Sequence, residues 1–499
     1  MELMDNLALG FATALSPVNL LYCFIGVLLG TLIGVLPGLG PVATIAMLLP
    51  LTFSLPPVSA LIMLSGIYYG AQYGGSTTAI LINLPGESSS VVTAIDGYQM
   101  ARQGRAGTAL ATAAIGSFFA GTVATVLLAL FAPPLADVAL SFGPAEYFSL
   151  MVLGLVASVA LAHGSLIKAI AMIVLGLLLG LVGSDVETGA QRFTFDKPEL
   201  ADGLNFVAVA MGVFGLGEII RNLENESIRS VMVRKVAGLM PSREDLRRII
   251  GPILRGTGLG SVLGILPGGG AMLASFAAYT LEKKVSRTPH RFGKGAIEGV
   301  AAPESANNAG AQTSFIPMLT LGIPSNPVMA LMIGALIIQG ITPGPNVVTD
   351  EPALFWGMIV SMWVGNFMLV VLNLPLIGIW VRLLTVPYHM LFPAILAFCC
   401  IGVYSVNSNA FDVYAMAVFG FVGYLLVKLE CEPAPLLLGF VLGPMLEEYL
   451  RRAMVLSRGD PTVFVTRPLS LALLIVAVAV LTLVLLPAIR AKREEAFQE

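Results

Sequence analysis

The sequence has 499 residues, of which 57% are hydrophobic and only 11% are charged, with a net charge of −3. Soluble globular proteins carry about 25% charged residues, so a soluble globular fold is excluded. The slightly acidic balance provides no basic surface for nucleic acid. Residues 6–86, 305–349 and 352–381 contain no Asp, Glu, Lys or Arg. Since about 20 apolar residues cross a bilayer, we expect an all-α polytopic membrane protein with about 11–12 transmembrane helices.

The N-terminal residues and the cysteines exclude two further features. Residues 1–6 carry no Lys or Arg, so we expect no cleavable signal peptide, and the first apolar run is part of the mature protein. The four cysteines, Cys23, Cys399, Cys400 and Cys431, form neither a CxxC pair nor a cluster with histidine. The sequence therefore predicts no disulfide framework, no metal site and no cofactor.

Two glycine and proline patterns recur along the chain. Glycines spaced by four residues precede a Leu-Pro-Gly motif at 36–38, and the same arrangement precedes 266–268, 230 positions later. A Gly-Ala-Gln motif at 70–72 precedes Leu84-Pro85-Gly86, and Gly-Ala-Gln at 310–312 precedes Ile323-Pro324-Ser325. These matches predict two homologous repeats. We divide the chain into a first membrane repeat, a basic cytoplasmic connector, a second membrane repeat, and a terminal transmembrane helix with a cytoplasmic tail, at 1–222, 223–250, 251–450 and 451–499.

Charge predicts the orientation of these repeats. The connector is rich in Lys and Arg, as is the tail after residue 489, and such loops mark the cytoplasmic side. The N-terminus has no positive charge and is expected outside. The first half then crosses the membrane an odd number of times, and the repeats are inverted. One loop conflicts with this topology. A single helix separates it from the basic tail, so the two should lie on opposite sides of the membrane. The loop is nevertheless basic, because it contains Arg451, Arg452, Arg458 and Arg467.

Glycine and proline within apolar runs predict broken helices or re-entrant hairpins. Freed backbone groups are tolerated at membrane depth where protein or a cavity satisfies them, and paired breaks in two repeats point to a transporter's binding site. The breaks also carry hydroxyl and amide groups, which can bind carboxylates or Na⁺, and helix N-termini that favour anions. In the first half, the candidate site residues are Gly74, Gly75, Ser76, Thr77, Thr78, Asn83, Pro85, Gly86, Ser88, Ser89 and Ser90. In the second half, they are Glu304, Ser305, Asn307, Asn308, Thr313, Ser314, Pro324, Ser325 and Asn326.

Small residues also have a structural interpretation, because they allow membrane helices to pack closely. We favour packing for single glycines such as Gly26 and Gly256. For 88–90, solvation in a loop and ligand binding stay equally open, as does a coupling role for Glu304. Glu146 follows a Gly-Pro pair and is interpreted as a helix cap. The isolated histidines, His163, His290 and His389, are assigned to loops or packing.

The broken segments resemble the large membrane subunit of the tripartite tricarboxylate transporters, the TctA type. The similarity lies in Tyr-Gly-Ala-Gln-Tyr-Gly-Gly-Ser at 69–76, Asn-Leu-Pro-Gly-Glu at 83–87, Asp-Gly-Tyr-Gln-Met-Ala at 96–101 and Ala-Pro-Glu-Ser-Ala-Asn-Asn-Ala at 302–309. It implies a multi-pass secondary transporter of the bacterial inner membrane with a periplasmic solute-binding protein. It also implies a small membrane subunit of about four helices, and carboxylate substrates such as citrate, usually with cation coupling.

The sequence lacks a Walker A motif, so we expect ion gradients to drive transport. The hypothesis is symport of tricarboxylates or related organic acids with Na⁺ or H⁺. An intramembrane enzyme is the first alternative, but it needs a catalytic pair at membrane depth, whereas Asp96 and Asp137 are predicted in loops. A passive channel is the second alternative, and duplicated breaks fit alternating access better.

Overall fold

The computed structural model describes residues 2–36, 40–84, 86–161, 165–185, 188–224, 236, 238–266, 270–384 and 388–485. Several features discussed above lie outside these ranges: Pro85, the Pro-Gly motifs at 37–38 and 267–268, His163, residues 225–235 of the basic connector, and the basic tail. The described regular structure is helical apart from one two-stranded antiparallel hairpin. The prediction of an all-α protein is confirmed.

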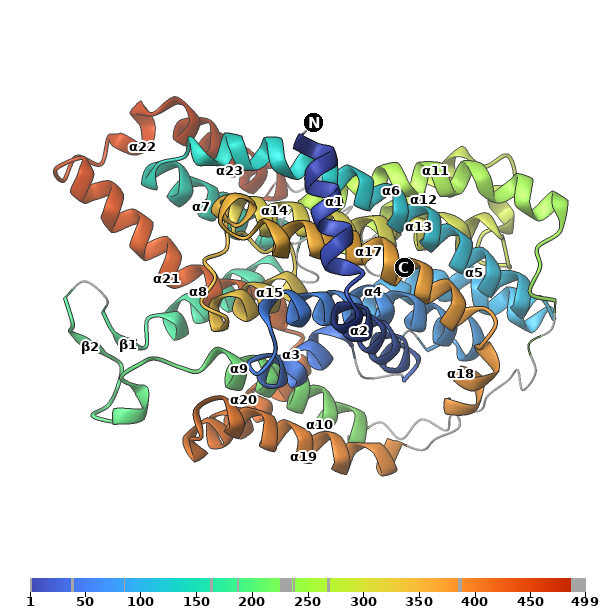
Figure 1. Cartoon of the computed structure of the whole chain (residues 1–499), viewed down its shortest axis with the longest axis horizontal. Helices are drawn as coiled ribbons and strands as arrows, with labels where there is room; N and C mark the ends of the chain where they lie inside the picture. The colour runs from blue at the N-terminus through green and yellow to red at the C-terminus, as the bar shows by residue number, and fades with distance from the viewer. Residues whose placement is uncertain are drawn as a thin grey trace.

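The elements of the first half follow one another along the chain in the colours blue to green of Figure 1. They are α1 (Glu2–Ala14), α2 (Pro17–Val35), α3 (Pro41–Thr52), α4 (Pro57–Ile82), η1 (Ser88–Ser90), α5 (Val91–Arg102), α6 (Ala106–Leu140), α7 (Pro144–Leu161), α8 (Leu166–Gly180), β1 (Gly183–Ser184), β2 (Gln191–Arg192), η2 (Pro198–Leu200), α9 (Phe206–Ala210), the π-helix η3 (Met211–Leu216) and α10 (Gly217–Glu224).

The second half contains a similar succession of long and short helices. They are α11 (Arg243–Ile265), α12 (Gly270–Val285), η4 (Pro289–Arg291), α13 (Glu298–Thr313), α14 (Phe315–Leu321), α15 (Pro327–Ile338), α16 (Asn346–Asp350), α17 (Pro352–Asn373), α18 (Ile377–Leu383), α19 (Tyr388–Asn407), α20 (Ala410–Lys428), α21 (Pro433–Leu456), α22 (Val463–Thr466) and α23 (Pro468–Leu485). The expected boundaries at 250/251 and 450/451 fall inside α11 and α21.

Several helices are long and apolar enough to cross a membrane. Within the described ranges, 4 meet both criteria: α2, α6, α17 and α20. Shorter apolar helices include α3, α7, α8, α15 and α23. The long helices confirm a polytopic membrane protein, and the short ones follow from glycine and proline breaks within apolar runs. The expected number of crossings stays a prediction.

Helices α2 and α4 pack with almost no space between their backbones. A Cβ atom on Gly26, Gly30 or Gly34 would lie 2.3, 2.4 and 2.5 Å from the carbonyl oxygens of the facing α4 residues Met63, Ile67 and Ala71. Such distances are impossible for a real side chain. The interpretation of Gly26 as a packing residue is confirmed, and the four-residue spacing places all these glycines on one helix face.

Helices α11 and α13 meet in the same way. A Cβ on Gly256, Gly260 or Gly264 would lie 2.4, 2.2 and 2.4 Å from carbonyl oxygens of α13, those of Ala302, Ala306 and Gly310. The packing interpretation of Gly256 is confirmed as well. This local correspondence supports the predicted duplication, whereas a repeat covering each half, and its inversion, stay predictions.

The breaks that follow α4 and α14 also share a backbone conformation. Helix α4 ends at Asn83 with φ 57° and ψ 28°, and α14 ends at Gly322 with φ 68° and ψ 22°, both left-handed. The chain then extends, with φ −148° at Glu87 and φ −157° at Asn326, before the next helical turn begins. Left-handed residues of this kind terminate helices, and the side chains that follow can cap the next one.

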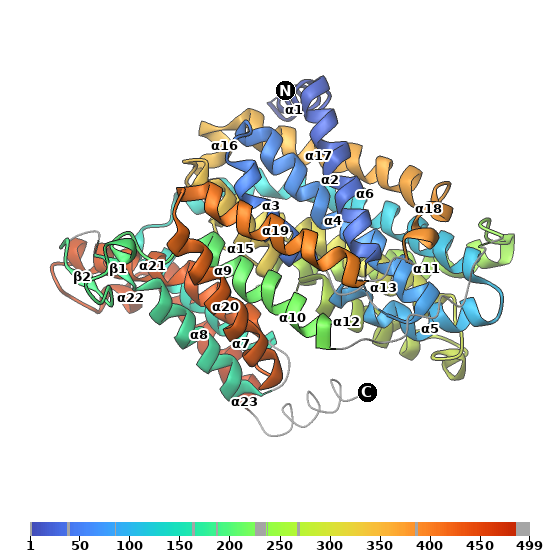
Figure 2. The ribbon, with the colours of Figure 1, turned by 90° about the horizontal axis from the view of Figure 1, so that it is seen from below.

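Charge differs between the two ends of the molecule. Figures 1 and 2 show β1, β2 and α22 at one end and α5 and α11 at the other. At the first end, Arg451 bonds Asp185 and Glu447, and Arg467 bonds Glu146. Acidic partners therefore compensate the basic loop that conflicted with the expected topology. The other end contains an excess of cations in or beside α5, the start of α11 and the segment after α12: Arg102, Arg105, Arg243, Arg247, Arg248, Lys283, Lys284, Arg287, Arg291 and Lys294.

The loop prediction for Asp96 and Asp137 is wrong, because these residues lie in α5 and α6. Asp137 is exposed. Asp96 is fully buried and accepts hydrogen bonds from the Tyr279 hydroxyl at 2.9 Å and from the backbone N–H groups of Gly295 and Ala296 at 2.8 Å each. These donors satisfy the carboxylate and connect α5 to the segment before α13. Asp96 thus has a structural role.

Changing Gly260 to Ala tests the close packing of α11 on α13. The added methyl group has no space beside the Ala306 carbonyl, so the helices must separate, and we expect a destabilisation of about 1–3 kcal/mol. Gly258→Ala is the matched control on the same helix, because no atom lies within 4 Å of its Cβ position. Alanine there should be neutral or stabilising. Melting of both variants in detergent measures the difference, and equal melting temperatures would contradict the packing argument.

Candidate functional site

The break after α4 lies against the end of α2. A Cβ on Gly86, in the break after α4, would lie 1.8 Å from the carbonyl oxygen of Gly34, near the end of α2. The Thr78 hydroxyl donates a hydrogen bond of 2.8 Å to the Val35 carbonyl, one of the unpaired acceptors at that helix end. Close packing of α2 on α4 therefore places the end of α2 beside the break after α4.

Breaks from the second half meet similarly, and the two groups touch. Gly270, the first residue of α12, lies beside Asn326, with 3.4 Å between its Cβ position and the asparagine Cβ. The amide of Asn326 donates to the Tyr68 hydroxyl of α4 at 3.3 Å, and Ser275 of α12 donates to the Ser89 carbonyl at 3.0 Å. Polar groups of the breaks after α4 and α14, together with Ser275 of α12, are thus gathered in one buried region.

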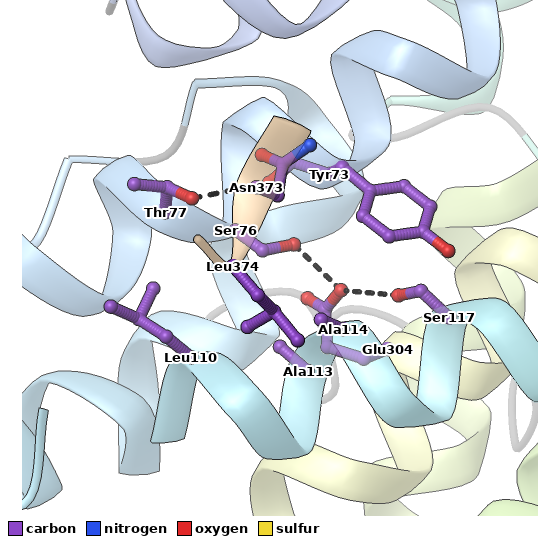
Figure 3. A pocket seen from close by; sticks show the side chains of 10 residues that line it. All are labelled: Tyr73, Ser76, Thr77, Leu110, Ala113, Ala114, Ser117, Glu304, Asn373 and Leu374. Carbon is purple, nitrogen blue, oxygen red and sulfur yellow. Dashed lines mark hydrogen bonds between the residues drawn. The ribbon is translucent and has the colours of Figure 1, made fainter. Parts of the chain in front are cut away.

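Glu304 lies at the centre of hydroxyl groups from three other helices. It is fully buried on α13 and accepts a 2.6 Å hydrogen bond from Ser76 of α4 and a 3.4 Å bond from Ser117 of α6. Thr93 of α5 donates to its other carboxyl oxygen. Figure 3 shows Ser76 and Ser117 pointing toward the carboxyl group. Three neutral hydroxyl groups thus bond this side chain, and no described Lys, Arg or His forms an ion pair with the carboxyl group.

Two asparagines extend this cluster along α13. The Asn308 amide donates to Ser117 at 2.7 Å and to the side-chain oxygen of Asn307 at 2.6 Å. The amide nitrogen of Asn307 is buried and has no hydrogen-bond partner within the described structure. A buried polar group without a partner is rare in native proteins and requires an explanation such as a ligand or a water molecule.

A small pocket adjoins Glu304. Its volume is about 10 Å³, and it is lined by Tyr73, Ser76, Thr77, Leu110, Ala113, Ala114, Ser117, Glu304, Asn373 and Leu374. Sites for small organic molecules usually measure about 300–1,000 Å³. The pocket therefore has space for one water-sized ligand, and an organic acid requires the surrounding helices to separate.

Glu87 and Ser89 form a second polar group close to the first. Glu87 is 8% exposed, packs against Gly75 of α4 and accepts a hydrogen bond from the Ser89 hydroxyl. Ser89 also lies 2.7 Å from the side-chain oxygen of Gln72. Gly75 provides the space for this carboxyl group, because a Cβ there would lie 2.8 Å from Cγ of Glu87.

Asn326 organises the break before α15. Its side-chain oxygen caps the helix by accepting from the Met329 N–H at 3.0 Å, and its amide donates to Ser314 at 3.1 Å as well as to Tyr68. Ser325 donates to the Ser314 carbonyl at 3.3 Å, and Pro324 is buried between them. These bonds hold the N-terminus of α15, with its partial positive charge, toward the other breaks.

The remaining predicted residues have other places in the structure. Thr77 lines the small pocket, and the Ser90 hydroxyl bonds the Glu87 carbonyl at 2.8 Å. Asn83 and Ser88 are exposed. A further group takes part in helix packing or bonds its own helix: Gly74, Thr78, Gly86, Ser305 and Thr313. The structure thus brings Ser76, Ser89, Glu304, the two α13 asparagines, Ser314 and Asn326 into the buried polar region.

Sequence reasoning missed several members of this region. Thr93, Ser117 and Asn373 lie outside the segments that the sequence singled out, and they join this region only through helix packing. Gln72, Tyr73 and Glu87 lie within the motifs discussed above. Polar side chains in or beside an apolar, uncharged stretch indicate a functional site, so the sequence alone could have identified these three residues.

Changing Asn326 to Ala tests its role in positioning α15. The change removes the cap and two donor contacts, and the loss of an N-cap alone costs about 0.5–2 kcal/mol. Asn326→Ser retains a capping oxygen and should lose less stability. Ser88→Ala, at an exposed position, is the control, and its melting temperature should equal that of the parent protein. Equal melting of all three variants would show that Asn326 does not position the helix.

Comparison with known proteins identifies the family. The family model described as "Tripartite tricarboxylate transporter TctA family" matches residues 20–438. An Agrobacterium vitis protein described as "Uncharacterized 52.8 kDa protein in TAR-I ttuC' 3'region" is 68% identical over 499 residues, covering 100% of this chain and 99% of that protein. A second protein of that organism, described as "Uncharacterized protein in TAR-II ttuC' 3'region", is 66% identical over 240 residues, covering 48% of this chain and 99% of its own length. No solved structure matches the chain. The chain belongs to the TctA family of tripartite tricarboxylate transporters, a family of transporters rather than enzymes.

Proposed function

We propose that this chain is the large permease subunit of a binding-protein-dependent secondary transporter that takes up tricarboxylates or related organic acids by cation symport. The observation that carries the proposal is that the breaks after α4 and α14 meet in one buried, polar region, beside the end of α2 and the start of α12. In a membrane protein, irregular backbone at such a place is typical of a solute pathway.

The breaks offer suitable groups for an organic acid. Helices α3, α5, α12 and α15 all begin at or just after a break, which places N–H groups and partial positive charge at the breaks. Asn326, Ser314 and Ser89 add amide and hydroxyl groups that can donate to a carboxylate. Neutral donors of this kind bind an anion without a buried Lys or Arg.

Energetics favour coupling to cations. Moving one charge against 100 mV costs about 2.3 kcal/mol, so a trianion entering a negative interior faces roughly 7 kcal/mol. About three cotransported cations, Na⁺ or H⁺, cancel that electrical term. The absence of a Walker A motif from the chain is consistent with transport driven by ion gradients.

The transporter works with two partners in this proposal. A small membrane subunit of the tripartite assembly lies beside the chain in the bacterial inner membrane, and a periplasmic solute-binding protein delivers the organic acid. Positive residues mark the cytoplasmic side of membrane proteins, so the end with α5 and the start of α11 faces the cytoplasm. The end with β1, β2 and α22 then faces the binding protein.

Uptake into liposomes tests the proposed function. The chain and its small subunit are reconstituted and supplied with the binding protein and labelled mono-, di- and tricarboxylates, citrate included. We expect accumulation above the outside concentration, and we expect it to require both an inward Na⁺ or H⁺ gradient and the binding protein. Uptake that merely equilibrates would indicate a channel, and no uptake of any carboxylate would contradict the proposed substrate class.

Cysteine labelling in whole cells tests the orientation. Thr462→Cys places a thiol at the end with α22, and His290→Cys places one at the opposite end, both at exposed positions. We expect a membrane-impermeant maleimide to label the first variant in intact cells and the second only after permeabilisation. The parent protein, with its four native cysteines, provides the background. The reverse pattern would overturn the orientation and leave the fold unaffected.

A further inference from the structure

We propose that one end of the molecule binds anionic phospholipids of the surrounding membrane. The binding surface, called the cationic surface below, consists of exposed side chains at the end with α5 and the start of α11: Arg102, Arg243, Arg247, Lys283, Lys284 and Lys294. These side chains hold the lipid phosphates, while apolar faces of α5 and α11 contact the acyl chains. The inference goes beyond the proposed function, because it concerns the outer surface and holds for any transported solute.

The segments that carry these cations meet in the fold. In the turn between α5 and α6, Arg105 bonds Asp245 near the start of α11 at 2.7 Å. The neighbouring Gln103 amide donates to the Lys294 carbonyl, in the segment before α13, at 2.8 Å. Helix α12, whose last turn contains two lysines, packs against α11. Cations from separate parts of the chain therefore share the end of the molecule where Figures 1 and 2 show α5 and α11.

Most acidic side chains of this end are already paired with other cations. Arg248 bonds Glu298 at 2.7 Å, and Arg255 bonds the buried Glu282 at 2.5 and 3.0 Å. The ion pair at the start of α11 uses a third acid. Among the described residues of 243–298, this leaves Glu244 as the one acid without an ion pair. The six side chains of the cationic surface form no ion pair with any described residue.

At the opposite end, several arginines have acidic partners. Arg451 bonds Asp185 at 2.7 Å, and Arg467 bonds Glu146 at 2.8 Å. Like charges repel one another, so a cluster of cations without acids is stabilised by anions from outside the chain. Phosphate groups suit this cluster, because the guanidinium group of arginine can donate two parallel hydrogen bonds to their oxygens.

Apolar side chains continue the charged face of α11 away from the end of the molecule. Arg243, Arg247, Ile250 and Leu254 follow one another at intervals of three or four residues, which places them on the same side of the helix. Ile250 is 56% exposed and Leu254 is 54% exposed, so the protein leaves this face open. The cations lie at the start of the helix, and the apolar residues lie one to three turns further along it.

Helix α5 has the same arrangement with the opposite chain direction. Val91, Ile95 and Arg102 lie on one side of the helix and are all exposed, with the arginine in the last turn. A phospholipid likewise presents its phosphate at the membrane surface and its acyl chains below, so both faces match its order of charge and apolar surface. A soluble anion would use the cations alone and leave the apolar faces uncovered. In the proposed orientation this end meets the cytoplasmic leaflet, whose anionic lipids attract Lys and Arg.

Adding lipid to the protein in detergent tests the cationic surface. The purified chain with its small subunit is kept in a neutral, lipid-free detergent at low ionic strength. Phosphatidylglycerol or phosphatidylcholine with identical acyl chains is added, and inorganic phosphate is the probe for a free anion. We expect phosphatidylglycerol to raise the melting temperature in a saturable manner, because it binds the folded protein. Phosphatidylcholine and inorganic phosphate should have little effect, and added KCl should weaken the effect of phosphatidylglycerol.

Removing two charges locates the binding. In the double variant Arg243→Gln with Arg247→Gln, the half-saturating concentration of phosphatidylglycerol should rise about fivefold for each charge, or about 25-fold in all. Lys197→Gln with Arg458→Gln removes two exposed charges from the opposite end and is the matched control. This control should titrate like the parent protein.

Each remaining outcome decides against the proposal. Equal stabilisation by the two lipids, or by inorganic phosphate, would overturn the assignment to an anionic phospholipid. An unchanged phosphatidylglycerol titration in the Arg243 and Arg247 double variant would overturn the location. If that variant does not fold, Lys283→Gln with Lys284→Gln decides the location in the same way. None of these results depends on the transported solute, so a failure of organic-acid uptake would leave the cationic surface unaffected.

Discussion

The contact of glycine faces with carbonyl oxygens on the facing helix determines where the polar groups of this protein lie. In these contacts α2 touches the backbone of α4, and α11 touches that of α13. A single methyl group in either contact would push the two helices apart and displace the polar groups that they carry. The arrangement of hydroxyl, amide and carboxyl groups around Glu304 depends on this spacing, although none of the glycines contributes a polar side chain.

A second constraint is the absence of water from the membrane interior. Every buried polar group must find a partner within the protein, and most do: Asp96 has three donors, and Asn326 makes three bonds. Six buried side-chain atoms have no partner in the described structure, on Thr112, Arg192, Thr257, Asn307, Gln312 and Asn373. Unsatisfied groups are costly, so Asn307, next to Glu304, and Asn373, in the lining of the small pocket, require an explanation such as a ligand or a water molecule.

Sequence reasoning identified the membrane fold, the breaks and about half of the polar region. The spacing of glycines and the length of segments without charged residues are local properties of the sequence. They suffice to predict helices, their close packing and the breaks within them. Thr93, Ser117 and Asn373 could not be found in this way, because their meaning comes from neighbours more than 180 positions away. Asn83 and Ser88 were predicted as site residues, but both are exposed, for the converse reason. A hydroxyl or amide in a break faces either solvent or protein, and only the packed structure determines which.

The breaks after α4 and α14 place different residues in front of the next helix, and this difference has a further consequence. Glu87 and Asn326 share an extended backbone conformation, yet one side chain is an acid and the other an amide. A solute bound between them would meet an acceptor on one side and a donor on the other. Such a site would be chemically asymmetric, and even a symmetric dianion would bind with one preferred end. Stereoselectivity toward chiral hydroxy acids would follow from this asymmetry without any additional residue.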